Sequence, residues 1–254
     1  MKIVFLITNQ TTGIFGQNPG LWYREDMSEL VEIGKNFKTT KNRTGFLPIY
    51  EKYFCFFKNK KINILEIGID DGGSLKLWRK YFPNANIAGL DIFHKDFLID
   101  GVKMHQGDQS NIADLKKITN EYKYFDIIID DGSHVSKQTI KSFYYLFDFL
   151  KEDGLYVIED LQTSYLPNFG GSRINLKKKT SMNFVKSLSD SINYELNDRP
   201  FFKKNKFDGN ISFVHFFQNI AFIKKGKSNQ YFYKDKIKNN FINKLKKIIS
   251  FFYK

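Results

Sequence analysis

The sequence lacks the residues and patterns that mark several common classes of protein. Cys55 is the only cysteine among 254 residues, so an intramolecular disulfide and a cysteine-rich zinc site are both excluded. No apolar run is long enough to span a bilayer. The short apolar stretch at Met1–Gln10 has no small-residue cleavage pattern after it, so we expect a strand there rather than a signal peptide. The expected location is therefore the reducing cytoplasm.

Positive charge, in contrast, is in excess. Lys and Arg number 40 against 27 Asp and Glu, which gives a formal net charge of +13. Such a charge suits nucleic acid, anionic lipid or a phosphorylated substrate. The lysines gather at 177–179, at 201–206 and after 224, away from the motifs in the middle of the chain. Because no nucleic-acid recognition motif accompanies them, we favour a solvated surface and expect no nucleic-acid partner.

Apolar runs alternate with helical patterns through the middle of the chain. The predicted strands are Lys61–Ile67, Asn86–Ile92, Val102–Gln106, Phe125–Ile129 and Gly154–Ile158, and the predicted helices between them are Leu75–Phe82, Ile112–Tyr122 and Thr139–Leu150. This alternation predicts parallel strands with right-handed crossovers. Ile211–Phe217 and Asn219–Lys224 predict an antiparallel hairpin at the sheet edge. The expected fold class is α/β, with a mostly parallel seven-stranded sheet and helices on both faces.

Composition divides the chain into three regions. Residues 1–58 are irregular and glycine-punctuated, and we expect an N-terminal lid or substrate segment there; residues 59–226 carry the alternating pattern and form the expected main domain. Residues 227–254 are Lys-rich with apolar residues at helical spacing, which predicts a basic amphipathic C-terminal helix. Such a helix packs on its own domain or on a partner subunit, or else lies on anionic lipid at the inner membrane face.

The segment Ile64–Ser74 has the pattern of a strand, a glycine-rich turn and a helix start. Gly68 allows the backbone to come close to a ligand, and the helix N-terminus offers free N–H groups. The spacing is not the G-x-G-x-x-G of dinucleotide binders, and Asp70 and Asp71 would repel a pyrophosphate. A ligand with a positive sulfonium or ammonium group fits these acidic surroundings better.

Acidic residues also follow the next two predicted strands. Asp91 ends the second strand, at about the interval where an acidic residue binds a ribose hydroxyl pair in such folds. Asp108 follows the third strand and could reach an adenine; the alternative is a turn or helix-cap role, and Ser110 could serve as that cap equally well. Because ligands bind at the carboxyl ends of parallel strands, these turns predict one cofactor pocket.

A second acidic group follows the fourth and fifth predicted strands, as an Asp-Asp-Gly-Ser-His run and a Glu-Asp pair. Asp131, Glu159 and Asp160 could converge there as hard oxygen ligands, which suits Mg²⁺, or Mn²⁺ or Ca²⁺, rather than zinc. Such an ion orients a substrate hydroxyl and lowers its pKa, and the nearby His134 could take the proton. Turn formation and helix capping are the alternative explanations for these residues.

Together these motifs resemble the class I S-adenosylmethionine (SAM)-dependent methyltransferases. They are most similar to the metal-dependent macrolide-type sugar O-methyltransferases of the mycinamicin and tylosin type, some relatives of which are labelled cephalosporin hydroxylases. The similar segments are Ile64–Ser74, Gly89-Leu90-Asp91, Gly107–Ser110, Phe125–His134, Gly154–Gly171 and Val214–Ile220, within residues 36–226. The resemblance implies a Rossmann-like SAM methyltransferase domain over 59–226, with SAM and Mg²⁺ (or Mn²⁺) as cofactors. It leaves homo-oligomer formation open.

The resemblance also assigns roles to single residues. The residues expected to bind the cofactor are Glu66, Gly68, Ser74, Asp91, Asp108, Gln109 and Asp130; those expected to bind the metal are Asp131, Glu159 and Asp160; those expected to act in catalysis are His134, as the base, and Asp131. One departure affects the lid. Relatives commonly have Thr-Asp-Lys ahead of the core, where this chain has Thr39-Thr40-Lys41, so the resemblance does not imply the architecture of this segment.

The expected reaction is methyl transfer from SAM to the hydroxyl of a nucleotide-activated sugar or a glycan precursor, for example for a capsule or another surface polysaccharide. Basic residues such as Arg173 and Lys177–Lys179 could hold a diphosphate. A phenol or catechol O-methyltransferase is an alternative. RNA methylation is disfavoured because phosphates would meet the carboxylates. A non-enzymatic scaffold would predict a broken site, whereas the acidic residues and His134 are all present.

Overall fold

The computed structural model describes residues 28–174, 179–194 and 204–227. The strand expected at Met1–Gln10 lies outside these residues, and so does the C-terminal helix predicted over 227–254, apart from its first residue. In the part of the chain that is described, no helix is both long and apolar enough to cross a membrane.

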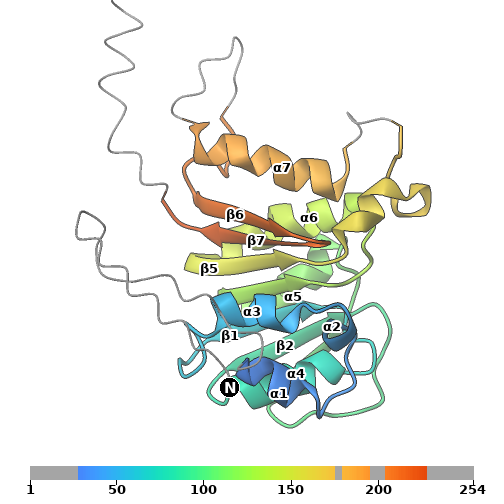
Figure 1. Cartoon of the computed structure of the whole chain (residues 1–254), viewed down its shortest axis with the longest axis vertical. Coiled ribbons are helices and arrows are strands. Elements are labelled where there is room, and N and C mark those ends of the chain that lie inside the picture. Colours follow the sequence, from blue (N-terminus) through green and yellow to red (C-terminus); the bar gives the residue numbers. More distant parts are fainter. Residues whose placement is uncertain (1–27, 175–178, 195–203, 228–254) are drawn as a thin grey trace, which may run out of the picture.

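A seven-stranded sheet forms the centre of the molecule, in the order β3-β2-β1-β4-β5-β7-β6 (Figure 1). The strands are β1 (Asn63–Ile67), β2 (Asn86–Asp91), β3 (Val102–Gln106), β4 (Phe125–Asp130), β5 (Leu150–Ile158), β6 (Ile211–Phe217) and β7 (Ile220–Lys225). The first five run parallel, whereas β7 is antiparallel to β5 and β6 is antiparallel to β7. The predicted parallel sheet with an antiparallel edge hairpin is confirmed.

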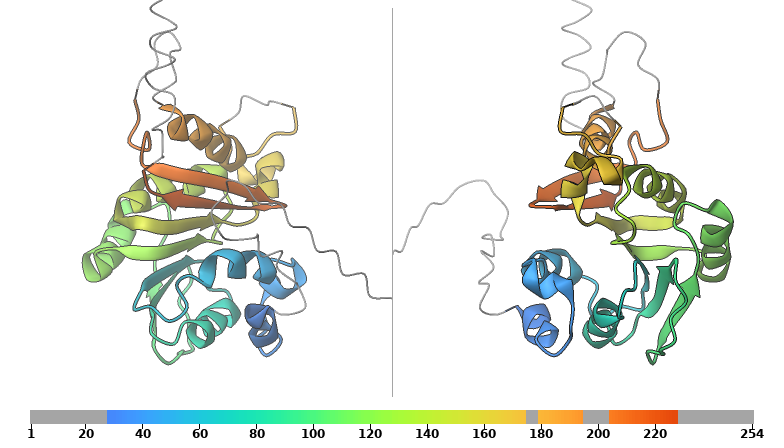
Figure 2. Two further views of the ribbon diagram at one scale, coloured as in Figure 1. Left: turned by 60° about the vertical axis from the view of Figure 1, so that its left-hand side comes forward. Right: turned by 90° about the vertical axis from the view of Figure 1, so that its right-hand side faces the viewer.

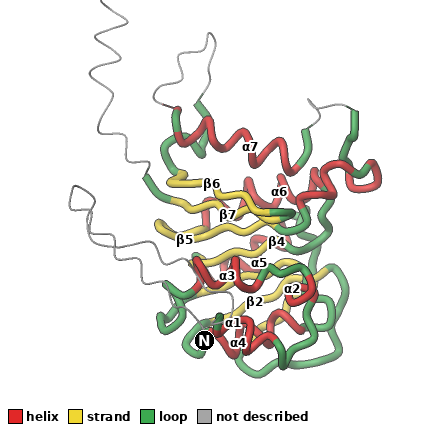
Figure 3. Tube along the Cα trace, in the orientation of Figure 1, coloured by secondary structure: helices red, strands yellow, loops and turns green. Residues whose placement is uncertain are grey.

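Helices cover both faces of this sheet, as Figures 2 and 3 show. They are α1 (Glu29–Gly34), α2 (Thr40–Arg43), α3 (Leu47–Phe54), α4 (Gly73–Tyr81), α5 (Ile112–Tyr122), α6 (Ser136–Leu146) and α7 (Ser181–Ile192), with short 3₁₀ turns η2 (Phe147–Phe149), η3 (Leu161–Tyr165) and η4 (Pro167–Phe169). Side chains of α1, α3 and α4 enter one core cluster, and side chains of α5, α6 and α7 enter the other. The sheet therefore lies between two layers of helices.

Strand β4 shows why the sheet is buried on both sides. Phe125 and Ile128 belong to the cluster beneath α5 and α6, whereas Ile127 and Ile129 belong to the cluster beneath α3 and α4. All four side chains are fully buried. Ile127, Ile128 and Ile129 alternate between the two faces, as successive strand residues do, whereas the register shift between Phe125 and Ile127 takes Phe125 out of this alternation. A strand covered on both faces needs an almost continuous apolar run, which Asp126 interrupts here.

The N-terminal helices pack against the face that carries α4. Tyr50 and Phe54 of α3 contact Trp78 of α4, with ring centroids 5.1 and 5.4 Å away. The buried Glu51 carboxylate accepts hydrogen bonds from the Ser28 hydroxyl and from the backbone N–H of Leu30 at 3.1 Å. These contacts fix residues 28–54 beside the carboxyl edge of the sheet.

Two elements differ from the sequence-based expectation. The helix predicted over Thr139–Leu150 is α6, which begins at Ser136 and ends at Leu146. A 3₁₀ turn and a longer β5 take up the remaining residues, because Leu150 pairs with Phe125. Helix α7 was not predicted, although its apolar residues Phe184, Val185 and Leu188 recur at helical spacing and are buried.

Gly68, in the turn after β1, gives a test of this packing. Its φ is +92°, and a Cβ there would lie 2.1 Å from the Asp131 carbonyl oxygen. Gly45 also has a positive φ, +69°, but a Cβ there would meet nothing within 4 Å. We expect Gly45→Ala to lower the free energy of unfolding by about 1 kcal/mol through backbone strain alone, and Gly68→Ala to lower it by at least about 2 kcal/mol more. Urea denaturation of both variants measures this; equal losses would contradict the close approach.

Candidate active site

A cavity of about 1240 Å³ opens at the carboxyl ends of the parallel strands. Ligand pockets typically have volumes of about 300–1,000 Å³, so this one has room for two ligands side by side. The predicted site residues that line it are Gly68, Ser74, Asp91, Asp108, Gln109, Asp131, His134, Glu159 and Asp160. Gly68, Asp108 and Gln109 come from the turns after β1 and β3, Ser74 from the start of α4 and Asp91 from the end of β2, whereas the last four come from the turns after β4 and β5.

Asp91, at the end of β2, organises the glycine-rich turn. One carboxylate oxygen accepts the N–H groups of Ile69 and Asp70 at 2.9 and 3.2 Å, and the other accepts the N–H of Phe93 at 2.9 Å. The Lys95 ammonium lies 3.0 Å from the carboxylate. Burial raises the pKa of Asp91, but these donors lower it by more, so the net pKa lies below its ordinary value. Asp91 is therefore an ionised hydrogen-bond acceptor in the half of the cavity where we expect the cofactor, at the ends of β1, β2 and β3.

Gln109 connects the turn after β3 to the turn after β4. Its amide nitrogen donates to Asp130 at 3.0 and 3.2 Å, and its amide oxygen accepts the N–H of Ser133 at 2.7 Å. Burial raises the pKa of Asp130 to about 6, although hydrogen bonds from Ser142 and Gln109 lower it. Nearby, Asp108 accepts the N–H of Ser110 at 2.7 Å, which is the turn role considered for it.

Glu66 and Asp130 lie behind the cavity rather than in its lining. Glu66 is fully buried and accepts hydrogen bonds from the Ser74 hydroxyl at 2.8 Å and the Trp78 indole at 3.1 Å. Burial is the main reason that the pKa of Glu66 is raised. Contact of either carboxylate with a cofactor stays a prediction; in the structure both fix the residues that face the cavity.

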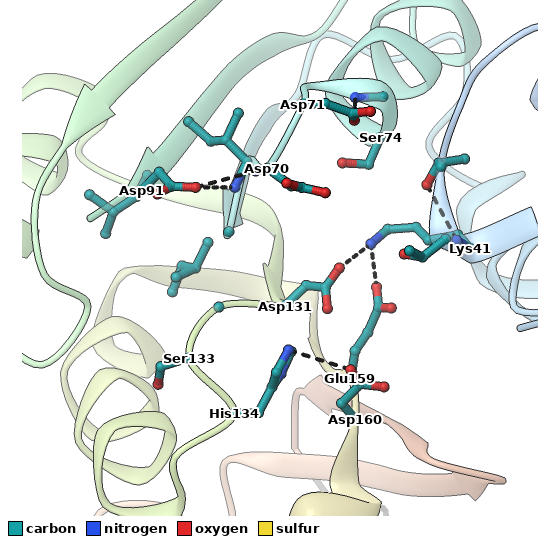
Figure 4. Close-up of a pocket in the computed structure, with 18 of the residues that line it drawn as sticks. Lys41, Asp70, Asp71, Ser74, Asp91, Asp131, Ser133, His134, Glu159 and Asp160 are labelled. Carbon is teal, nitrogen blue, oxygen red and sulfur yellow. Dashed lines mark hydrogen bonds and ion pairs between the residues drawn. The ribbon is translucent and has the colours of Figure 1, made fainter. Parts of the chain in front are cut away.

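Asp131, His134 and Asp160 meet in the other half of the cavity. One possible ligand atom from each lies within 4.8 Å of the other two, and Nε2 of His134 is 3.4 Å from the Asp160 carboxylate (Figure 4). The Thr163 hydroxyl donates to the His134 carbonyl at 3.1 Å and to the Asp160 carbonyl at 2.7 Å, which ties the two turns together. Two carboxylates and an imidazole at this spacing suit a divalent ion.

The backbone at this cavity is unusual. Among the described residues, six non-glycine residues have positive φ, and Asp70, His134 and Asp160 of these line the cavity, with φ of 47°, 56° and 52°. Such backbone angles cost energy for residues other than glycine, although less for Asp and His than for most residues, and are concentrated at functional sites. The turns after β1, β4 and β5 hold their polar side chains at this edge despite that cost.

Lys41 of α2 lies between the two halves. Its ammonium is 2.6 Å from Asp131, 2.8 Å from Glu159 and 3.3 Å from Glu66, and the side chain is 1% exposed (Figure 4). Burial lowers the pKa of Lys41, but the negative charges of Asp131, Glu159 and Glu66 raise it by more, so the net pKa is well above its ordinary value. The amine is therefore a buried, charged cation.

Glu159 faces Lys41 rather than the cluster around His134. Its carboxylate also accepts a hydrogen bond from the Tyr50 hydroxyl of α3. Burial, and then the charge of Asp131, raise the pKa of Glu159, while Lys41 and Tyr50 lower it. The structure thus brings the predicted metal ligands Asp131 and Asp160 together, whereas the Glu159 carboxylate pairs with Lys41. Its role as a ligand stays a prediction.

Sequence reasoning missed Lys41, Tyr50 and Lys95 as site residues. Lys41 lies 90 positions before its partner Asp131, and no strand or turn pattern links them. The available signal was the Thr39-Thr40-Lys41 motif, which was considered only for the lid. Such a lysine has no acidic neighbour in the sequence and precedes several strands that end in carboxylates. It is therefore a candidate counterion for one of those carboxylates.

No protein-family model matches the chain. Two curated relatives are each 37% identical to it: mycinamicin VI 2''-O-methyltransferase of Micromonospora griseorubida over 216 residues and demethylmacrocin O-methyltransferase of Streptomyces fradiae over 214 residues. Each match covers 80% of this chain but 54% of the relative. The chain thus spans about half the length of the curated relatives that it matches.

Solved structures give the same result. MycE, a methyltransferase from the mycinamycin biosynthetic pathway solved in complex with Mg and SAH, matches with a TM-score of 0.74 and 35% identity, over 80% of this chain and 55% of that chain. A second MycE structure, which also contains mycinamycin VI, matches with a TM-score of 0.73. This chain is therefore a homologue of macrolide O-methyltransferases over about half of their length, and it shares the Rossmann-like methyltransferase fold of MycE.

Proposed function

We propose that this chain is a SAM-dependent O-methyltransferase that uses a divalent ion, Mg²⁺ by preference, to methylate a sugar hydroxyl. One observation carries the proposal: Asp131, His134 and Asp160 gather in the same cavity as Asp91 and the glycine-rich turn. A methyl donor and an acceptor must lie side by side for in-line transfer. The relatives named above are sugar O-methyltransferases, and the MycE structures contain Mg and SAH.

The cofactor half fits SAM in its charge and shape. Asp70, Asp71 and Asp91 line it, and such an acidic wall suits a sulfonium and an ammonium group. Asp91 is placed to accept the ribose hydroxyls. One of its oxygens accepts two backbone N–H groups of the glycine-rich turn. The Lys95 ammonium, 3.0 Å from the carboxylate, is the partner that we expect a ribose to displace.

The metal half fits a hard divalent cation. Asp131 and Asp160 supply carboxylate oxygens that lie close together, Glu159 is expected to complete the set, and the His134 imidazole beside them is left free to act as the base. When bound, the ion orients the acceptor hydroxyl and lowers its pKa.

His134 then takes the hydroxyl proton at Nε2, and the Asp160 carboxylate 3.4 Å away stabilises the resulting imidazolium. The acceptor oxygen forms a bond to the methyl carbon as the bond from that carbon to the sulfonium sulfur breaks. The products are the methyl ether and S-adenosylhomocysteine, and the proton remains on His134 until solvent removes it.

The acceptor that we propose is a nucleotide-activated sugar or a glycan precursor. Lys38 and Arg43 line the cavity and are exposed at its rim, which supports an acceptor that carries phosphate. Arg173, beyond η4, is exposed but does not line this cavity, so its contact with a phosphate stays a prediction. We also propose that the protein acts in the cytoplasm, in contact with the inner membrane face. Its role there would be in the synthesis of a surface polysaccharide.

Removal of the metal tests the proposal directly. We expect methyl transfer from SAM to a panel of nucleoside diphosphate sugars to stop in excess EDTA and to return when Mg²⁺ is added, because the ion activates the hydroxyl. Mass spectrometry of the sugar products measures this. Full activity in excess EDTA would exclude the metal, and methylation of catechols but not of sugars would favour the phenol alternative.

Substitution of His134 separates catalysis from cofactor binding. We expect His134→Ala to lower kcat by about 10²-fold or more, with the Kd of SAM nearly unchanged. Asp91→Asn is the matched control: it should raise the Kd of SAM by about tenfold or more because it weakens the ribose site. Steady-state kinetics and equilibrium binding measure the two effects. Normal turnover in His134→Ala would leave His134 with a structural role only.

A further inference from the structure

Lys41 brings a positive charge from the N-terminal segment (residues 28–58) into the acidic edge of the sheet. It comes from α2, a helix of four residues, whereas its carboxylate partners lie on β1 and in the turns after β4 and β5. Its ammonium is within 3.3 Å of all three carboxylates. Because this side chain is 1% exposed, the ion pairs are hardly screened by water or salt.

The carboxyl groups around Lys41 outnumber it. Glu66, Asp131 and Glu159 surround one ammonium, and a carboxylate oxygen of Asp160 lies within 4.8 Å of one of Asp131. One ammonium cannot occupy all of these oxygens, so hard oxygen ligands remain for a divalent ion.

The Lys41 ammonium and the proposed divalent ion share two carboxylates, those of Asp131 and Glu159. Oδ2 of Asp131 is 2.6 Å from the Lys41 ammonium, and Oε1 of Glu159 is 2.8 Å from it. The same two carboxylates are proposed above as ligands of the divalent ion. A carboxylate that is paired with Lys41 is therefore less available to the ion, and two cations that share the same carboxylates repel each other.

We propose that Lys41 is a positioning residue whose ammonium holds the N-terminal segment on the site and competes with the divalent ion for Asp131 and Glu159. This inference rests on the proposed function for the place of the ion. It goes further because it predicts that docking of the N-terminal segment and binding of the ion oppose each other. Since such coupling is reciprocal, the ion loosens the segment by the same factor by which the docked segment weakens the ion.

The test compares Mg²⁺ binding to the full chain and to three variants, by isothermal titration calorimetry without SAM or acceptor. Lys41→Met keeps the apolar stem and removes the charge, and Lys41→Arg keeps the charge. Lys35→Met removes an exposed lysine of the same segment, whose ammonium pairs with Glu32 of the same helical turn. We expect Lys41→Met to lower the Kd of Mg²⁺ by at least about tenfold. Lys41→Arg and Lys35→Met should stay within about threefold of the parent chain.

The direction of this change separates the proposal from a purely structural role, because a damaged site would bind Mg²⁺ more weakly. An unchanged or higher Kd in Lys41→Met, or no Mg²⁺ binding by either protein, would overturn the inference. Hydrogen–deuterium exchange of the unmodified chain decides the matter even if Lys41→Met does not fold. Mg²⁺ should speed amide exchange in Thr40–Phe46, and unchanged or slower exchange there would also overturn it.

These readouts do not depend on methyl transfer. Tighter Mg²⁺ binding in Lys41→Met together with no methylation of any sugar would refute the proposed function and leave the coupling intact. Methylation that requires Mg²⁺, together with an unchanged Kd of Mg²⁺ in Lys41→Met, would support the proposed function and refute the coupling.

Discussion

The burial of one ammonium among three carboxylates is the interaction on which the site depends. A buried charge is tolerated only when it is paired and hydrogen-bonded, and Lys41 meets this condition through Glu66, Asp131 and Glu159. The reverse also holds, because these carboxylates would repel one another at the end of the sheet without a cation. Lys41 therefore allows the ends of three strands to bring acidic groups together, two of which, Asp131 and Glu159, line the cavity beside the N-terminal segment.

Sheet topology explains why the acidic groups meet at all. β1, β4 and β5 are neighbours and run parallel, so their carboxyl ends lie at one edge, and the turns after them place Gly68, Asp131 and Asp160 side by side. Gly68 lets the turn after β4 approach within contact of the turn after β1. The left-handed backbone at His134 and Asp160 holds both side chains at the cavity. Rigid strands thus fix the positions, and the turns supply the chemistry.

Much of this arrangement can be predicted from local sequence. Almost continuous apolar runs such as Phe125–Ile129 identify the central strands, and acidic residues directly after them identify the edge where a ligand binds, because both signals depend on neighbouring residues only. The role of Lys41 could not be predicted in this way, since its pairing with Asp131 spans 90 positions. The direction in which Glu159 points is likewise set by Lys41 and by Tyr50 of α3, which no pattern in the segment around Glu159 reveals. Gln109 was expected at the cofactor, and its amide links Asp130 to Ser133, a role that also depends on tertiary contacts.

The claim that this edge of the sheet holds a divalent ion is tested most directly by anomalous diffraction from crystals grown with Mn²⁺ and S-adenosylhomocysteine. A manganese peak in contact with the carboxylates of Asp131 and Asp160, with the nucleoside beside Asp91, is the predicted result. A nucleoside in that place with no manganese peak near Asp131, or with manganese bound elsewhere on the chain, would contradict it.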